Sequence, residues 1–308
     1  MTIVETLAPL ILLIALGAGL AHIKFLGREF MADLNKLAFW IALPALLFTS
    51  ANHASEPGSQ TWLLLAVLLG ATLLICVVGW GVSFLLRMPG SARGTLMQSA
   101  FRGNLAYIGI PVLAYSLDND NRAMATAVIV MVLLMAFYNI LAVIVLQQPN
   151  HHAGGPDFVR VLKSIATNPL MLAGLAGLIL PFSGIVLPTF VNRALDSLGN
   201  AAVPIALLCI GGSLAITPLR GRRSWIVAAA LLKIAVLPFL VFWLGRMAGL
   251  GPKELRIAMV LTACPTAAAS FVMAKQMGGD EALASGSIAL STVLSALSLA
   301  AALWVTGL

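Results

Sequence analysis

Long apolar runs separated by short polar segments extend along the whole chain. A helix that crosses a bilayer needs about 20 predominantly apolar residues. We expect ten such helices, at 3–22, 34–51, 62–86, 96–117, 122–146, 169–184, 198–216, 225–247, 256–276 and 283–305. The sixth is the weakest, because Pro181 and Gly184 interrupt it. The pattern therefore predicts an all-α membrane protein with ten transmembrane helices.

Composition supports this fold class. Of the 308 residues, 60% are hydrophobic and 9% are charged, whereas soluble domains carry about 25% charged residues. A soluble enzyme, a disordered chain and a secreted disulfide scaffold are therefore excluded. The net charge of +7 does not indicate nucleic acid, because the basic residues lie in short segments between apolar runs and form no single basic face.

Lys and Arg divide unevenly between the two sets of loops. The loops after the first, third, fifth, seventh and ninth helices contain eleven: Lys24, Arg28, Lys36, Arg87, Arg93, Arg160, Lys163, Arg220, Arg222, Arg223 and Lys275. The other loops contain five: Arg122, Arg193, Arg246, Lys253 and Arg256. Basic loops stay in the cytoplasm. Both termini are therefore expected outside, with the central loop in the cytoplasm.

The two halves of the chain share features at similar spacing, with five helices on each side of a central loop. Three pairs recur across it: Pro111 and Pro265, 154 positions apart, and Pro44 with Pro204 and Asp120 with Asp280, each 160 apart. Because five is odd, two copies insert with opposite orientation, as in many secondary transporters. We expect two inverted five-helix repeats, 1–147 and 169–308, joined by a cytoplasmic linker at 148–168.

Proline interrupts the fourth helix at Pro111 and the ninth at Pro265. Proline removes a backbone donor and opens the helix beside it. Matched interruptions in two halves are a good sequence indicator of a transporter's binding site, and the helix that begins after a break suits an anion. A simple kink without function remains the alternative for each proline.

Charged side chains within the spans are both cations, Arg102 and Lys233. All eleven carboxylates map to loops or helix ends. An intramembrane charge is costly, and it marks a functional site by default. Two cations without buried anions favour an anionic solute. The alternative is that either side chain extends to the membrane interface.

Enzyme motifs are not found in the sequence. It contains no metalloprotease motif, nucleophile elbow or P-loop, and its three cysteines lack the spacing of metal ligands. We therefore expect neither catalysis, nor a metal, nor a cofactor.

Several stretches carry a recognisable pattern. They are Asn104–Pro111, Pro265–Lys275, Leu34–Leu37 with Leu43 and Pro44, Asn168 with Pro169, and Leu198–Pro204. Taken in order, they resemble the auxin efflux carrier family across nearly the whole chain. The length and the short central loop are similar to bacterial members, including proteins named as malonate carriers, more than to the plant PIN auxin carriers.

That resemblance implies a fold similar to the bile acid/sodium symporters. Helices 1, 2, 6 and 7 would form a scaffold, and helices 3–5 and 8–10 a transport domain. Helices 4 and 9 would be broken and would cross at Pro111 and Pro265. A homodimer built through the scaffold and an elevator-type movement are implied as well.

The resemblance also assigns a substrate site beside the crossing. Its expected residues are Asn104, Tyr107, Gly109, Pro111, Pro265, Thr266 and Ser270, with charge attraction from Arg102 and Lys233. Thr266 stands where the plant carriers have glutamine, and Ser270 where they have a second proline. These departures argue against auxin itself as the substrate.

These observations lead to a prediction of function. We expect a secondary transporter of a small organic anion, an auxin-like or malonate-like mono- or dicarboxylate, in a bacterial inner membrane. The partners would be the substrate, the lipid bilayer and a second copy of the chain. Two alternatives stay open: a sodium-coupled organic anion symporter and a membrane receptor that binds a carboxylate without moving it.

Overall fold

The computed structural model describes residues 3–52, 58–117, 120–147, 166–183, 185–216 and 221–307. Within these ranges every regular element is a helix. Most of the expected linker, residues 148–165, lies outside the described residues, as do the loop cations Arg160, Lys163 and Arg220. The expectation of an all-α protein is confirmed for the described part of the chain.

The helices of the described residues follow one another along the chain. The α-helices are α1 (Ile3–His22), α2 (Arg28–Leu37), α3 (Leu43–Asn52), α4 (Ser59–Leu85), α5 (Gly90–Phe101), α6 (Ile110–Ser116), α7 (Asn121–Gln147), α9 (Pro169–Ile179), α10 (Thr189–Ile216), α11 (Arg223–Leu231), α12 (Leu237–Ala248), α13 (Pro252–Ala263), α14 (Ala269–Gln276) and α15 (Glu281–Val305). Wider π-helical turns are η1 (Ala38–Ala42), η2 (Leu105–Gly109) and η4 (Leu232–Val236), and η3 (Leu180–Phe182) is a 3₁₀ turn.

Seven helices in the described ranges are long and apolar enough to cross a bilayer. They are Glu5–His22, Glu29–Asn52, Ser59–Leu85, Asn121–Leu146, Thr189–Gly212, Arg223–Ala248 and Glu281–Val305. The expected fourth, sixth and ninth spans are not among them. The fourth and ninth are divided into shorter helices, and α9 has 11 residues. A helix of that length spans about 16 Å, which is short of a hydrocarbon core of about 30 Å.

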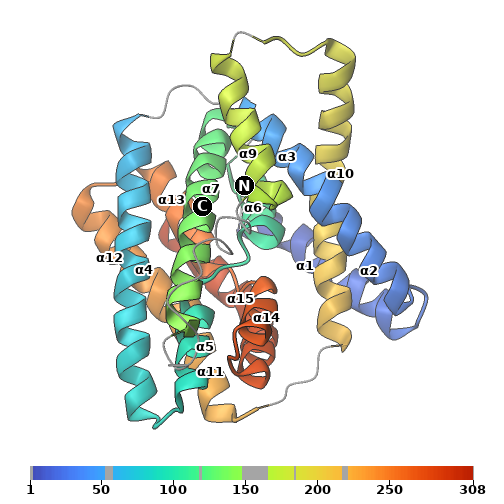
Figure 1. Cartoon of the computed structure of the whole chain (residues 1–308). Coiled ribbons are helices and arrows are strands. Elements are labelled where there is room, and N and C mark those ends of the chain that lie inside the picture. The colour runs from blue at the N-terminus through green and yellow to red at the C-terminus, as the bar shows by residue number, and fades with distance from the viewer. Residues whose placement is uncertain are drawn as a thin grey trace.

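The helices pack in two groups. In the first, α1 packs along α10, and α3 packs against both α9 and α10. Gly211 permits this closeness, because a side chain there would overlap the backbone of Ile14 in α1. In the second group, α4, α5 and α7 pack with α11, α12, α13 and α15. Figure 1 shows α10, α1 and α2 on one side of the molecule and α4 and α12 on the other, with α7 between them.

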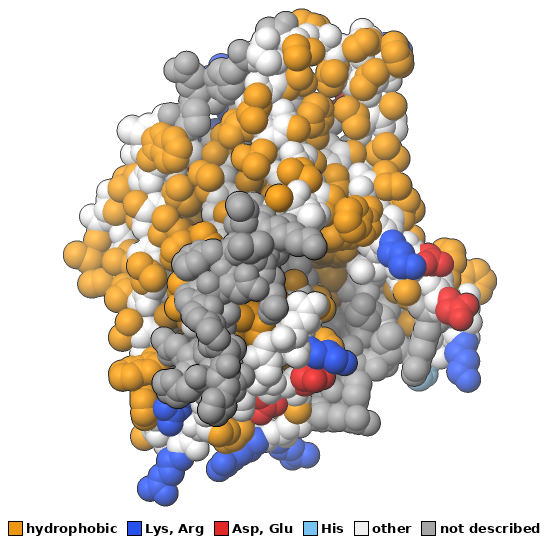
Figure 2. Space-filling model, in the orientation of Figure 1, with side chains coloured by type: hydrophobic (Ala, Val, Ile, Leu, Met, Phe, Trp, Pro, Cys, Tyr) orange, Lys and Arg blue, Asp and Glu red, His pale blue; other side chains and the backbone are white. Residues whose placement is uncertain are grey.

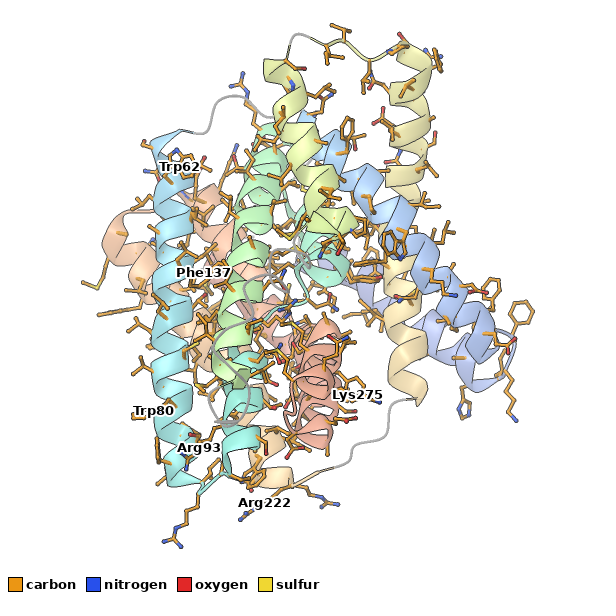
Figure 3. The ribbon with its side chains drawn as sticks, in the orientation of Figure 1. Trp62, Trp80, Arg93, Phe137, Arg222 and Lys275 are labelled. Carbon is orange, nitrogen blue, oxygen red and sulfur yellow. The ribbon has the colours of Figure 1, made fainter. Side chains whose placement is uncertain are left out.

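Large apolar side chains cover much of the outer surface, as Figure 2 shows. On α4, Trp62 and Trp80 are 54% and 51% exposed and lie toward opposite ends of the helix in Figure 3. Eighteen residues of helix separate them by about 27 Å, close to the thickness of the hydrocarbon core, about 30 Å. Tryptophan is enriched at both membrane interfaces. This surface therefore suits a lipid bilayer.

Basic side chains gather at one end of the face shown in Figure 2. Arg93 and Arg222 both lie toward this end in Figure 3. The sequence pattern placed both on the same side of the membrane, although Arg93 lies within α5 in the structure. Which side is cytoplasmic stays a prediction.

Candidate functional site

The first interruption follows α5. The helix ends at Phe101, and the next residue, Arg102, has an extended backbone with φ −76° and ψ 96°. Asn104 is also non-helical, and the chain then enters the wide turn η2 before α6. The carbonyl of Asn104 accepts hydrogen bonds from the N–H groups of Ile108 and Gly109, at 3.2 and 3.3 Å. Pro111 lies in α6, which continues directly from η2, so the chain breaks at 102–104 and not at Pro111 as expected. The wide turn η2 accommodates a residue that donates no backbone N–H.

The second interruption follows α13. This helix ends at Ala263, and Cys264 is extended, with φ −58° and ψ 146°. Proline disfavours a helical conformation in the preceding residue, so Pro265 accounts for this conformation. The helix resumes as α14 at Ala269.

The two interruptions pair with each other. Asn104 N–H donates to the Pro265 carbonyl at 2.8 Å, and Ala267 N–H donates to the Arg102 carbonyl at 2.9 Å. Gly103 and Thr266 thereby form an isolated antiparallel bridge. We call residues 102–104 and 265–267 the paired segments. Because buried backbone groups are costly without partners, this pairing stabilises two stretches that have left their helices.

A cavity of about 440 Å³ lies beside the paired segments. Its polar lining residues come from five parts of the chain: Asn35, Arg102, Asn104, Tyr107, Tyr138, Asn168 and Thr292. Apolar side chains, among them Phe39, Leu105, Met135, Leu170, Ile210 and Val272, form much of the remaining wall. Arg102 is the one charged side chain among the described residues that line it, so the cavity has a positive character.

The Arg102 guanidinium is held by neutral partners. Its Nη2 donates to Asn139 Oδ1 at 2.6 Å, and its Nη1 contacts Met273 Sδ at 3.1 Å. Within the described residues no carboxylate lies within 4.0 Å of it. The amide and the sulfur fix the direction of the side chain without neutralising its charge.

Three amide side chains add hydrogen-bonding groups to the cavity. Asn168 caps α9, since its Oδ1 accepts from Leu170 N–H and Met171 N–H at 3.0 and 3.4 Å. This leaves its Nδ2 as a donor. The side chains of Asn35 and Asn104 form no hydrogen bond within the described residues. Such groups can donate to the oxygens of a ligand.

The expected site residues fall into two sets. Arg102, Asn104 and Tyr107 line the cavity, and Tyr107 Oη donates to the Asn35 carbonyl at 3.4 Å. The others are not among its lining residues: Gly109, Pro111, Pro265, Thr266, Ser270 and Lys233. Sequence spacing alone could not separate these sets, because Asn104 and Tyr107 share a motif with Gly109 and Pro111.

Thr266 is fully buried and joins neighbouring helices. Its Oγ1 donates to the Ser99 carbonyl at 2.8 Å, and its N–H donates to Ser291 Oγ at 3.0 Å. Ser270 is also fully buried, and its hydroxyl has no hydrogen-bond partner within the described residues. Thr266 therefore fastens the second paired segment to α5 and α15.

Five polar residues of this region were not among the expected site residues: Asn35, Tyr138, Asn139, Asn168 and Thr292. Asn35 and Asn168 belong to stretches that carried the family resemblance, but their contact with the cavity depends on packing between distant helices. Tyr138 and Thr292 lie within the long apolar helices α7 and α15, outside those stretches. Asn139 had the clearest signal, because it is a lone amide within a long apolar run.

The comparisons with known proteins agree on a family. A model described as "Membrane transport protein" matches residues 2–154 and 158–304. A Rhizobium meliloti protein named "Putative malonate transporter" is 30% identical over 299 residues, which cover 93% of this chain and 90% of the relative. An uncharacterized transporter of Methanocaldococcus jannaschii is 24% identical over 294 residues, 91% of each chain.

The resemblance inferred from the sequence motifs is confirmed by these matches. The family match and the apolar helices together indicate a multi-pass membrane protein. The chain belongs to the membrane transport protein family that includes the auxin efflux carriers.

Proposed function

We propose that this protein is a secondary transporter of a small organic anion. The observation that carries the proposal is the Arg102 guanidinium, which lines the cavity and has neutral partners. A partly buried cation without a carboxylate partner is costly, and a bound anion would remove part of that cost.

The cavity offers chemistry that suits a carboxylate. A planar guanidinium matches the two oxygens of a carboxylate and can bind both. The amides of Asn104 and Asn168 supply further donors, and the apolar wall would contact the rest of the solute. A volume of about 440 Å³ is within the range of small-molecule sites, and it accommodates a small organic acid.

The cavity lies between the two groups of helices. Asn35, Asn168 and Ile210 come from the group that contains α2, α9 and α10, whereas Arg102 and Asn104 come from the other. When one group of helices moves as a rigid body relative to the other, a solute bound here would become accessible first from one side of the membrane and then from the other. We propose elevator-type alternating access on this basis, in which the Tyr107–Asn35 hydrogen bond opens.

We propose further that the chain consists of two inverted repeats of five transmembrane helices each, at 1–147 and 169–308. In this arrangement α5–α6 and α13–α14 act as broken fourth and ninth spans. The N-caps support the correspondence: Asp120 Oδ1 accepts from Ala123 N–H at 3.0 Å, and Asp280 Oδ1 accepts from Leu283 N–H at 2.9 Å. These two aspartates, 160 positions apart, cap the last helix of each half.

Transport in proteoliposomes tests the proposed function. Labelled malonate is the first probe, because a relative is named for it. Unlabelled mono- and dicarboxylates serve as competitors, and uncharged amides of the same acids serve as controls. Uptake that carboxylates inhibit and amides do not would support the proposal. If no carboxylate in the panel is transported or inhibits malonate uptake, the proposed function is wrong.

Repeating the assay with and without a sodium gradient decides between uncoupled and sodium-coupled transport.

A further inference from the structure

Lys233 is fully buried but does not line the cavity. It lies in η4, the wide turn between α11 and α12. Its ammonium donates to the Thr262 carbonyl at 2.7 Å. Within the described residues no carboxylate lies within 4.0 Å of it, so its charge is compensated by a carbonyl alone.

Thr262 lies at the end of α13, and this position gives the contact a physical reason. The last carbonyls of a helix lack partners within it and carry partial negative charge. A cation there satisfies a carbonyl and interacts favourably with the helix dipole. Arg102 directly follows the last residue of α5, but its guanidinium contacts Asn139 and Met273 and no carbonyl of that helix. Lys233 is thus the cation that stabilises a helix end at the paired segments.

Gly103 connects the buried ammonium with the cavity. It belongs to the paired segments and lines the cavity. A Cβ atom at this position would lie 3.3 Å from Lys233 Nζ and 3.2 Å from the Leu261 carbonyl oxygen. The absence of a side chain thus lets the ammonium approach the rear of the cavity wall. At such short range, and away from bulk water, its charge is weakly screened.

We propose that Lys233 is a positioning residue for anion binding. Through the Thr262 carbonyl it fixes the end of α13, and through the Gly103 backbone it keeps the adjoining cavity wall positive without touching the solute. The inference rests on the proposed anion site in one respect, namely that the cavity holds an anion. The electrostatic effect itself can be measured without any substrate.

The first experiment measures the potential inside the cavity with charged thiol reagents. Ala268 is exposed and lines the cavity, so Ala268→Cys is introduced together with Cys76→Ala, Cys209→Ala and Cys264→Ala. The modification rates with an anionic and a cationic methanethiosulfonate give a ratio that reports the local charge. Replacing Lys233 with Met should lower the anionic-to-cationic ratio about tenfold, because one weakly screened charge is lost.

Matched variants separate charge from structure. Lys233→Gln keeps a donor for the Thr262 carbonyl but removes the charge, so it should also lower the anionic-to-cationic ratio. It replaces Lys233→Met in the experiment if that variant does not fold. Lys233→Arg should preserve the ratio. Lys24→Met removes an exposed lysine and should leave the ratio unchanged. An unchanged ratio in the folded Met or Gln variant would overturn the proposal.

The second experiment measures malonate transport by the same variants. Lys233→Gln should raise KM for malonate about tenfold and change kcat less than about twofold, while inhibition by neutral malonamide stays the same. A purely structural role would instead lower kcat and thermal stability together. If the wild type moves no malonate, that substrate is wrong, and the thiol ratio still decides the role of Lys233.

Discussion

The two paired segments have similar backbones and different side-chain environments. In the first, Arg102 and Asn104 line the cavity. In the second, Thr266 is fully buried against Ser99 and Ser291, and Ala267 is the residue that reaches the cavity. The first segment thus supplies recognition groups, whereas the second supplies the support that holds them. The prolines do not match either, because Pro265 belongs to its paired segment whereas Pro111 lies in α6. A shared backbone arrangement therefore does not imply shared residue roles.

Their cations differ in the same way. Arg102 follows α5 and points its charge toward neutral groups at the cavity, whereas the cation at the end of α13 is Lys233, which comes from another helix and stays behind the wall. Arg102 is therefore accessible to a solute in the cavity, whereas Lys233 stabilises the end of α13. Substitutions at four positions test this contrast.

The largest effect is expected from Arg102→Gln. Removing one partner of a buried charge pair costs about 2–5 kcal/mol, so anion transport should fall by at least about 30-fold. Initial rates in proteoliposomes measure the loss. Arg223→Gln, at an exposed position of α11, is the control and should transport normally. Full transport activity of Arg102→Gln would show that Arg102 does not bind the anion, and would contradict the role assigned to the first paired segment.

The next effect is expected from Thr266→Val, which keeps the shape and removes the hydroxyl donor to Ser99. The unpaired buried carbonyl should lower the free energy of unfolding by about 1–3 kcal/mol. Thermal unfolding in detergent measures this change. KM should stay near the wild-type value, because Thr266 does not line the cavity. A large rise in KM with normal stability would place Thr266 in the binding site and would contradict the difference in role between the two paired segments.

Asn104→Ala should give the opposite result. Its side chain makes no hydrogen bond within the described residues, so stability should change little. Loss of one donor to the solute corresponds to about 1 kcal/mol, or about a fivefold rise in KM. Concentration series of uptake, paired with thermal unfolding, measure both quantities. A stability loss without a KM change would contradict the assignment.

The smallest effect concerns the capping aspartates. Lys253 Nζ contacts Asp120 Oδ2 at 2.5 Å, and this hydrogen bond holds the pKa of Asp120 below its ordinary value of 3.8. A lowered carboxyl pKa contributes stability above the ordinary pKa, and this stability is lost as the pH falls through the lowered value. Asp120→Asn should therefore lose about 0.2–1 kcal/mol at neutral pH, and the difference from wild type should vanish in acid. Equal stabilities at every pH would show that the ion pair contributes nothing.

Much of the fold could be predicted from the sequence, because apolar runs specify helices directly. The expected spans 62–86, 122–146 and 283–305 lie close to α4, α7 and α15. The break at Pro265 was predictable, since proline acts locally, whereas the break at 102–104 lies seven residues before Pro111 and was not. The wide turns η1, η2 and η4 were not predictable either, because a single wide turn is too short to change a periodicity read over a whole helix.

The site was harder to predict than the fold. Arg102 and Asn104 were identified because a charge and an amide are conspicuous in an apolar run. Thr266 and Ser270 lie in an equally conspicuous motif, yet both are buried away from the cavity. Side-chain direction after an irregular turn depends on local dihedral angles, which periodicity does not supply.

The most direct test of the central claim is an experimental structure of the protein with a transported anion bound. We predict density for a carboxylate in the cavity, within hydrogen-bonding distance of the Arg102 guanidinium and near the Asn104 amide, with Lys233 still bonded to the Thr262 carbonyl. Density elsewhere, such as beside Thr266 and Ser270 with Arg102 unoccupied, would contradict the claim.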